Sequence, residues 1–415
     1  MAVVRPFMGI RPSKDLVEKV ASLPYDVMNR KEAEEMSASN DYSFLHVVRA
    51  EIDVDDSVDQ YDKVVYETAR KNLDKMIEDK ILIQDESPCY YIYRQIMDGR
   101  VQTGLVGCTS IDDYMNNIIK KHEFTRPAKE VDRINNFDYC DANTAPIFLT
   151  YRKNDELNKI INDYIKFNKP IYNFTSEDDI THIVWVISGD SIIDNISRIF
   201  ENTKYLYIAD GHHRSASSVK VGLKRRQDNP EFTGEEEFNY FLSVIFPDED
   251  LFIMDYNRVV KDLNGYTKEE FLDKIRDNFL VEEYAGGSYR PVDKHTYGMY
   301  LDNKWYKLTA KDEITNKENI VDRLDVAILQ DNLLGPILDI KDPRTDKRID
   351  FIGGIRGLKE LERRVNEGMK VAFSMYPTTI DDLMEVADTG EVMPPKSTWF
   401  EPKLRSGLFV HRLSN

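Results

Sequence analysis

Three observations in the sequence predict an α+β protein. Residues 89–96 and 101–109 are rich in Tyr, Ile and Val, and the intervening Asp98-Gly99 favours a type I′ turn that joins them as a hairpin. Residues 182–187 form a short apolar run typical of a buried strand, and the residues after it repeat apolar side chains at helical spacing. No fixed-period repeat is present, which argues against a repeat architecture. The predicted strands and helices are therefore expected to share a common core.

The remaining elements follow from the same two periodicities. Apolar residues from Val58 to Ile77 recur near helical spacing, which predicts a helix within residues 57–79. Further helices are expected around residues 192–200, from Ser215 onward, within 267–330 and near 326–329. Strands are expected at residues 3–7, 43–49, 144–151, 204–209 and 238–246, with a second hairpin at 301–304. Pro24 makes residues 23–27 a loop, and glycines predict a turn at 351–357.

The length of 415 residues exceeds the size at which one hydrophobic core usually stops growing. The pattern of predicted elements changes after Asn257, and we therefore place a domain boundary near residue 260. No long Gly/Ser or Pro linker marks this boundary. We therefore divide the chain into an N-terminal α/β segment (residues 1–99), a central core (100–260) and a C-terminal α+β domain (261–415).

The charge of the chain narrows the classes of function. Asp and Glu number 74 against 56 Lys and Arg, a formal net charge of -18 at pH 7. Such an acidic surface repels phosphate backbones at long range, so we expect no nucleic-acid partner. No apolar run reaches the ~18 residues that span a bilayer, and the N-terminus lacks a signal segment, so we expect a cytoplasmic protein with no membrane partner. The three cysteines show no metal-ligand or disulfide pattern.

The sharpest local signal is the run Asp210-Gly211-His212-His213-Arg214, where a predicted buried strand passes into a helix. A helix start presents unpaired backbone N–H groups and the positive end of the helix dipole. Gly211 lets the backbone approach an anion, Arg214 offers a planar fork for phosphate oxygens, and the histidines add donors. Ser215 is expected to cap the helix, and Asp210 to hold Mg²⁺ or orient a histidine. The alternative is a satisfied turn with the histidines at the surface.

Two further segments carry candidate site residues. In the run Lys121-His122-Glu123-Phe124-Thr125, Glu123 could take a proton from a hydroxyl if the fold brings it to the phosphate; a solvated run of charges is the alternative. Near the C-terminus, the proline-rich run from Met393 to Leu408 either presents cations and hydroxyls to an anionic ligand or packs on the body through Trp399 and Phe400. The groups concerned are Lys396, Ser397, Thr398 and Lys403.

These segments together resemble a large bacterial and archaeal family catalogued only as a domain of unknown function, and the resemblance covers nearly the whole chain. The matching residues are Arg5-Pro6-Phe7 with Gly9-Ile10-Arg11-Pro12, Leu23-Pro24-Tyr25-Asp26-Val27, Lys121-His122-Glu123-Phe124-Thr125, Ala209-Asp210-Gly211-His212-His213-Arg214 and Met393-Pro394-Pro395-Lys396-Ser397-Thr398. Residues 100–255 are similar in pattern to the ParB/sulfiredoxin-like superfamily, which includes the free serine kinases. This resemblance implies a ParB/sulfiredoxin-like mixed core that binds phosphate, with additional N-terminal and C-terminal α/β elements.

The same resemblance implies an activity. Free serine kinases use ATP or ADP with Mg²⁺ to phosphorylate the hydroxyl of free L-serine, which gives O-phospho-L-serine. Carried onto this chain, Glu123 would accept the hydroxyl proton, with His213 and Asp210 as the other candidate catalytic groups and Asp210 as the magnesium ligand. The nucleotide would be bound by Gly211, His212, His213, Arg214, Ser215, Lys396, Ser397, Thr398 and Lys403. Sulfiredoxin chemistry is not expected, because His212 stands where that enzyme needs a cysteine.

Two other classes of function stay open at this point. A nucleotide- or phosphometabolite-binding regulator would keep Asp210 to Arg214 and tolerate the loss of Glu123. A nucleotide hydrolase would use the same phosphate site with water as the acceptor. The residues do not decide the donor nucleotide, the acceptor or the oligomeric state, a homodimer included.

Overall fold

The computed structural model describes residues 1–414 and divides into two compact units. The first unit comprises residues 1–251 together with the segment that begins at Pro402, and the second comprises Phe252–Glu401. The second unit is therefore inserted into the sequence of the first. This grouping differs from the three segments drawn from the sequence, because strands from residues 1–99 and 100–260 share one sheet. The α+β class is confirmed in both units.

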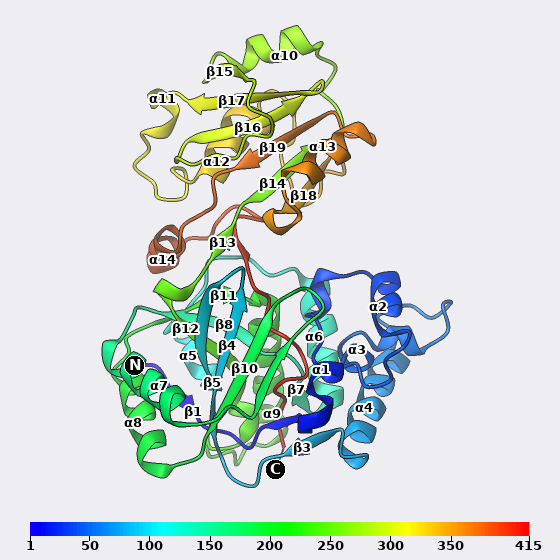
Figure 1. Ribbon diagram of the computed structural model, residues 1–415, viewed down its shortest axis with the longest axis vertical. Helices are drawn as coiled ribbons and strands as arrows, with labels where there is room; N and C mark the ends of the chain where they lie inside the picture. Colours follow the sequence, from blue (N-terminus) through cyan, green and yellow to red (C-terminus); the bar gives the residue numbers. More distant parts are fainter. Residues whose placement is uncertain (415) are drawn as a thin grey trace. The chain divides into compact units, whose positions relative to one another are not determined.

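A mixed nine-stranded sheet forms the core of the first unit (Figure 1). Its path runs β6-β11-β8-β12-β5-β4-β10-β9, with β1 added on β5, and only the pairs β6·β11 and β8·β12 are parallel. The predicted hairpin is present, with Asp98 at φ 50° and Gly99 at φ 76° between β4 and β5. The strands are β1 (Val4–Arg5), β4 (Tyr90–Met97), β5 (Arg100–Ser110), β6 (Ile119–Lys120), β8 (Ile147–Tyr151), β9 (Tyr172–Thr175), β10 (Thr181–Ile187), β11 (Leu206–Asp210) and β12 (Tyr240–Pro247).

Helices bury apolar faces against this sheet. Residues of α7 (Asp155–Phe167) and α8 (Asp190–Glu201) share one apolar cluster with Tyr90, Ile92 and Leu105 of the sheet. Helix α6 (Pro127–Cys140) packs along α9 (His212–Asp228). The other helices are α1 (Val17–Val20), α2 (Arg30–Ser37), α3 (Leu45–Val48), α4 (Lys63–Glu78) and α5 (Ile111–Met115). None of the helices within residues 1–414 has the length and apolarity to cross a membrane.

Residues 43–49 were predicted as a strand, and this prediction is wrong. Residues Leu45–Val48 form helix α3, whose Leu45, Val47 and Val48 are buried in an apolar cluster with residues of α4. The Ser43 hydroxyl accepts a hydrogen bond from the Leu45 N–H at 3.3 Å and favours the helical turn. The β-branched residues here serve burial rather than sheet pairing, since tertiary packing overrides intrinsic preference in short segments.

The C-terminal segment (residues 402–414) returns to the first unit and is bound there along its length. Ser22 and Ser406 exchange backbone hydrogen bonds of 3.1 and 2.9 Å, and Ile10 and Val410 exchange bonds of 3.0 and 2.8 Å. Two short antiparallel pairs complete this region: β2 (Ile10–Pro12) with β3 (Leu82–Gln84), and β7 (Ala142–Asn143) with β21 (His411–Arg412). The segment is thus an integral part of the first unit.

A six-stranded antiparallel sheet forms the second unit, in the order β15-β17-β16-β19-β14-β18. Its strands are β14 (Tyr256–Val260), β15 (Phe279–Tyr284), β16 (Thr296–Leu301), β17 (Lys304–Ala310), β18 (Ile349–Gly353) and β19 (Val371–Met375). The turn predicted at 351–357 is partly wrong, because residues up to Gly353 form edge strand β18 on β14. Its helices are α10 (Lys268–Ile275), α11 (Asp312–Thr315), α12 (Asp325–Leu329), α13 (Leu358–Asn366) and α14 (Ile380–Thr389), and β13 (Ile253–Met254) pairs with β20 (Trp399–Phe400).

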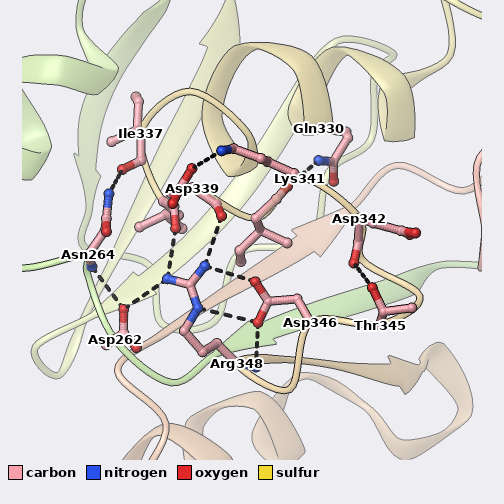
Figure 2. Close-up of polar contacts among 12 residues, drawn as sticks. Asp262, Asn264, Gln330, Ile337, Asp339, Lys341, Asp342, Thr345, Asp346 and Arg348 are labelled. Atoms are coloured by element: carbon pink, nitrogen blue, oxygen red, sulfur yellow. Dashed lines mark hydrogen bonds and ion pairs between the residues drawn. The ribbon is translucent and has the colours of Figure 1, made fainter.

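Arg348 organises the loop that precedes β18 (Figure 2). Its guanidinium donates to the carbonyls of Leu338 and Asp339 at 3.0 and 2.9 Å and to the Asp346 carboxylate at 2.8 Å. A weaker contact of 3.5 Å reaches Asp262. One arginine thus satisfies acceptors from three parts of the unit, which explains how a long connection without regular structure stays ordered.

We predict that Arg405 stabilises the C-terminal segment of the first unit. Its side chain is buried and donates to Ser176 at 3.0 Å and to both carboxylate oxygens of Asp178 at 2.5 Å. Arg405→Met removes these hydrogen bonds and should lower the free energy of unfolding by about 1–3 kcal/mol. The loss is limited because water can solvate the partly exposed Asp178 carboxylate. Urea denaturation measures this loss, with Arg198→Met on the exposed face of α8 as the control. Equal stability of the two variants would contradict the prediction.

Candidate functional site

The predicted strand-to-helix junction is present, and Gly211 is the residue that makes it. Strand β11 ends at Asp210, Gly211 adopts φ 96° and ψ 32°, and α9 begins at His212. A Cβ on residue 211 would be strained by this left-handed conformation and would lie 3.1 Å from Arg214 Nε. The guanidinium of Arg214 is therefore packed directly on the turn, beside the first amide groups of the helix.

The start of α9 is free of the features that usually neutralise a helix N-terminus. No side chain caps it, and its first turn contains no acidic residue. Ser215, the expected cap, does not cap: its hydroxyl donates back to the Gly211 carbonyl at 3.0 Å, as its backbone N–H also does at 2.9 Å. The positive end of the helix dipole is therefore not offset by its own first turn, which favours an anion at this position.

Asp210 ends β11 at the junction, and two cations hold its carboxylate. Its carboxylate lies 3.2 Å from Lys403 Nζ and 3.8 Å from Arg214 Nη2, and it accepts from the Gly211 N–H at 2.8 Å. Burial alone would raise the pKa of Asp210, but Lys403 and Arg214 hold that pKa well below its usual range. Asp210 is thus ionised, and it brings the C-terminal segment and α9 together at one point.

Two buried histidines lie against each other beside this carboxylate. His122 is 1% exposed, and its ring meets that of His212 edge-on at a centroid distance of 4.4 Å. Burial lowers the pKa of His122 to about 4 and lowers the pKa of His212 well below its usual value, so both rings are neutral at pH 7. The backbone N–H of His122 donates to His212 Nε2 at 3.4 Å, which favours the tautomer of His212 with its ring proton on Nδ1.

The segment around Glu123 reaches the same junction. Glu123 Oε2 lies 3.9 Å from His212 Nδ1, and the Arg126 N–H donates to His213 Nε2 at 2.9 Å. Glu130 then ties the segment to α9 through an ion pair with Lys220 and a hydrogen bond from Ser217 at 3.0 Å to its carbonyl. The fold therefore brings the Glu123 carboxylate to within 3.9 Å of His212 at the start of α9, and its role as a base stays a prediction.

One buried polar atom at the junction, Nε of Arg214, has no hydrogen-bond partner. The remaining contact of Arg214 is a short hydrogen bond from Nη1 to the carbonyl of Pro146. Buried polar atoms in proteins nearly always have partners, and isolated exceptions concentrate at functional sites. Such an atom beside an uncapped helix start makes this junction the candidate site for a polar ligand.

The structure adds two residues that the sequence analysis did not assign to the site, Tyr25 and Asp26. Tyr25 is buried, with the Arg133 guanidinium 3.9 Å above its ring, and the charge of Arg214 also acts on it. Burial lowers the pKa of His213, and the carboxylate of the neighbouring Asp26 opposes that shift. Residues 23–27, expected to be a structural loop, thus contribute to the surroundings of α9. Their presence among the family landmarks is the sequence signal that could have identified them.

The predicted phosphate-binding groups near the C-terminus separate into two sets. Lys403 lies at Asp210 in the first unit, whereas Lys396, Ser397 and Thr398 belong to the second unit. There, Ser397 donates to the Pro394 carbonyl at 2.6 Å, and the Lys396 carbonyl accepts from Arg258 at 3.1 Å. Only Lys403 is therefore placed at the junction by contacts within one unit, and the role of the other three stays a prediction.

The residues present do not form a metal site of their own. Within residues 1–414, no group of three or more His, Cys, Asp or Glu side chains is arranged to hold a metal ion. Asp210, the predicted magnesium ligand, is engaged by Lys403 and Arg214. Mg²⁺ in phosphotransferases is bound largely by substrate phosphates and one or two carboxylates, so the donor set suits an ion that arrives with a nucleotide and not a resident ion.

Comparisons with known proteins place the chain in a family. Residues 4–327 match the family described as "Protein of unknown function (DUF1015)", and the chain belongs to it. The expected family resemblance is thus confirmed. The chain matches none of the curated protein sequences.

Several solved structures are similar at low identity. A conserved hypothetical protein from Pyrococcus furiosus is 16% identical with a TM-score of 0.36, covering 73% of this chain and 93% of that one. A free serine kinase mutant in complex with AMP is 14% identical with a TM-score of 0.37, covering 74% and 89%. SbnI with a C-terminal truncation from Staphylococcus aureus is 11% identical with a TM-score of 0.40, covering 74% and 87%.

We predict that His122 makes the folded state sensitive to acid. The pKa of its ring is about 4 in the fold against 6.5 for an unperturbed histidine, so between these values the unfolded chain binds more protons. Stability should therefore fall as the pH is lowered from about 6.5 to about 4, with His122 accounting for up to about 3 kcal/mol.

Denaturant unfolding of the wild-type protein and of His122→Leu across this range measures that contribution. The variant should show a smaller loss, because leucine fills the site without a proton to bind. His182 and His212 are also buried with lowered pKa values and leave a residual dependence in both proteins. Identical pH profiles for the two proteins would refute the assignment.

Proposed function

We propose that this protein is a phosphotransferase that binds ATP or ADP at the start of α9 and phosphorylates the hydroxyl of a small molecule, with free L-serine as the first candidate. The observation that carries the proposal is the junction itself: an uncapped helix start, packed against a buried arginine whose Nε has no partner. The amide groups and the Arg214 fork suit a phosphate group at a single position.

In this proposal, Lys403 can contact either Asp210 or a bound phosphate. Without a ligand, the Lys403 ammonium pairs with Asp210 at 3.2 Å. A phosphate at the start of α9 offers Lys403 a second anion within reach of the same flexible side chain. Arg214, at 3.8 Å from Asp210 and 3% exposed, stays in place and keeps the carboxylate ionised. The two cations then offset the charge of the phosphate, which is the main catalytic requirement of phosphoryl transfer.

Glu123 supplies the general base. Its carboxylate is 39% exposed, so an acceptor can reach it, and its Oε2 lies 3.9 Å from His212 Nδ1. Glu123 takes the proton of the acceptor hydroxyl as its oxygen bonds to the terminal phosphorus, and the bond from phosphorus to the leaving nucleotide oxygen breaks. Burial lowers the pKa of His212, so this ring is a poor competitor for the proton of the acceptor. Mg²⁺ bound to the nucleotide would add charge neutralisation at the phosphates.

We predict that Glu123→Gln separates turnover from binding. The amide keeps the shape of the side chain but cannot accept the hydroxyl proton, so phosphoryl transfer should fall by at least about a hundredfold while the affinity for nucleotide changes by less than about twofold. Phosphorus NMR of the full-length protein with Mg²⁺, L-serine and ATP or ADP follows the O-phosphoserine resonance directly.

Glu249→Gln is the matched control, since that glutamate is 45% exposed and lies elsewhere in the first unit. Release of inorganic phosphate in place of phosphoserine would identify a nucleotide hydrolase. Nucleotide binding with no turnover on any hydroxyl acceptor would identify a binding protein and contradict the proposal.

We also predict that Lys403 contributes to nucleotide affinity. Lys403→Met removes one charge-assisted contact to phosphate, so the Kd for ADP should rise by about tenfold. Isothermal titration at constant ionic strength measures it, and Lys153→Met, which removes a half-exposed lysine from an ion pair with Glu249, serves as the control. Equal Kd values for the two variants would place the phosphate away from Lys403.

A further inference from the structure

A pocket of about 710 Å³ opens on the first unit next to the junction described above. It is formed by the residues before α2, by the loop at 56–61 and by the first turn of α6. Its lining is dominated by polar and charged side chains, among them Asn29, Arg30, Arg49, Ser57, Tyr61 and Lys129. The sequence argument assigned no function to any of these residues.

Three of the lining side chains are cations. Arg49 forms an ion pair with Glu51 at 2.9 Å, yet its Nε is buried without a hydrogen-bond partner and its contact with the Tyr25 carbonyl is long, at 3.5 Å. Arg30 contacts Glu34 at 2.8 Å, the Val54 carbonyl at 2.9 Å and Asp56 at 2.7 Å, but Asp56 is 93% exposed and so offers only weak compensation of its charge. Arg49 and Arg30 therefore retain donor capacity for an anionic group that enters the pocket.

Two residues connect this pocket to the proposed phosphate site. Lys129 lines the pocket, and its charge acts on His213 in the first turn of α9. Tyr25 accepts from Arg49 through its carbonyl, and its ring lies 5.9 Å from Lys129 Nζ. The charge of Arg214 reaches the same tyrosine. Arg126, three residues before Lys129 at the start of α6, donates its backbone N–H to His213 Nε2 at 2.9 Å, so the pocket lining at Lys129 lies close to the start of α9.

We propose that this pocket binds the phosphoryl acceptor and that it selects a small hydroxy compound carrying a carboxylate. This inference rests on the proposed phosphotransferase function and specifies its second substrate. Arg49 and Lys129 bind the carboxylate, and this places the hydroxyl of the same small molecule toward His213 and Glu123. Asp56 and Asp59, which also line the pocket, accommodate an ammonium group on the same molecule without requiring one.

Three hydroxyl compounds distinguish the groups that are recognised: L-serine carries a carboxylate and an ammonium, D-glycerate only the carboxylate, and ethanolamine only the ammonium. Binding of each to the full-length protein is measured by isothermal titration without nucleotide. L-serine and D-glycerate should bind, and ethanolamine should bind at least about tenfold more weakly. Equal binding of ethanolamine, or binding of none of the three, would overturn the inference.

Substitutions of Arg49 and Lys129 test whether these residues bind the carboxylate of the acceptor. Arg49→Gln and, independently, Lys129→Gln on the surface of α6 should each weaken the binding of D-glycerate by about tenfold. Arg49→Gln should leave the Kd for ADP unchanged, and Arg198→Gln on α8 should change the affinity for neither D-glycerate nor ADP. The lysine variant keeps the test valid if loss of the Arg49–Glu51 pair disturbs folding. Unchanged glycerate binding in Lys129→Gln and in a folded Arg49→Gln would refute the assignment.

ADP titration separates this inference from the function on which it rests. If ADP binds and depends on Lys403 but no carboxylate compound binds, the acceptor pocket is wrong and the nucleotide site stands. If ADP does not bind while D-glycerate binds through Arg49, the proposed phosphotransferase function fails and the pocket binds its carboxylate ligand for another purpose.

Discussion

The ionised carboxylate of Asp210, held between Lys403 and Arg214, is the contact on which the site depends. Two cations beside the positive end of a helix would repel each other, and removing them from water is costly unless a counter-charge is present. Asp210 provides that charge at 3.2 and 3.8 Å. Because Asp210 lies at the end of β11, where the chain passes from the sheet into α9, the ion pair also fixes where the C-terminal segment meets the core.

This arrangement makes the first unit depend on residues that follow a long insertion. The second unit occupies residues 252–401, and Lys403 comes directly after it. The segment 402–414 is then bound by backbone pairs at Ser22 and Ile10 and by the buried side chain of Arg405 on Asp178. A site that needs Lys403 is complete only when this segment has docked. Folding of the first unit is thus coupled to a contact that closes a loop of about 150 residues, which is an entropically slow event.

Much of the local structure could be predicted, and the errors have physical causes. The Asp98-Gly99 hairpin, the helix within 57–79 and the β11–α9 junction follow from turn chemistry and periodicity, which are local properties. Residues 43–49 became a helix because burial against α4 outweighed β-branching. His122 escaped notice because its importance lies in contact with His212, ninety positions away in sequence. Likewise, no periodicity reveals that Lys403 reaches Asp210, and only the family landmark indicated Tyr25.

The identity of the charged groups explains how the proposed phosphate site stays locally positive in an acidic protein. The chain carries a net charge of -18, which opposes the approach of any phosphate at long range. Within the junction the positive charge comes from an arginine, a lysine and a helix start, groups that keep their charge throughout the physiological pH range. The two histidines beside them are neutral because burial lowers their pKa values. They therefore add hydrogen-bonding groups and shape without adding charge, and the balance between Asp210 and its two cations stays constant as the pH varies around neutrality.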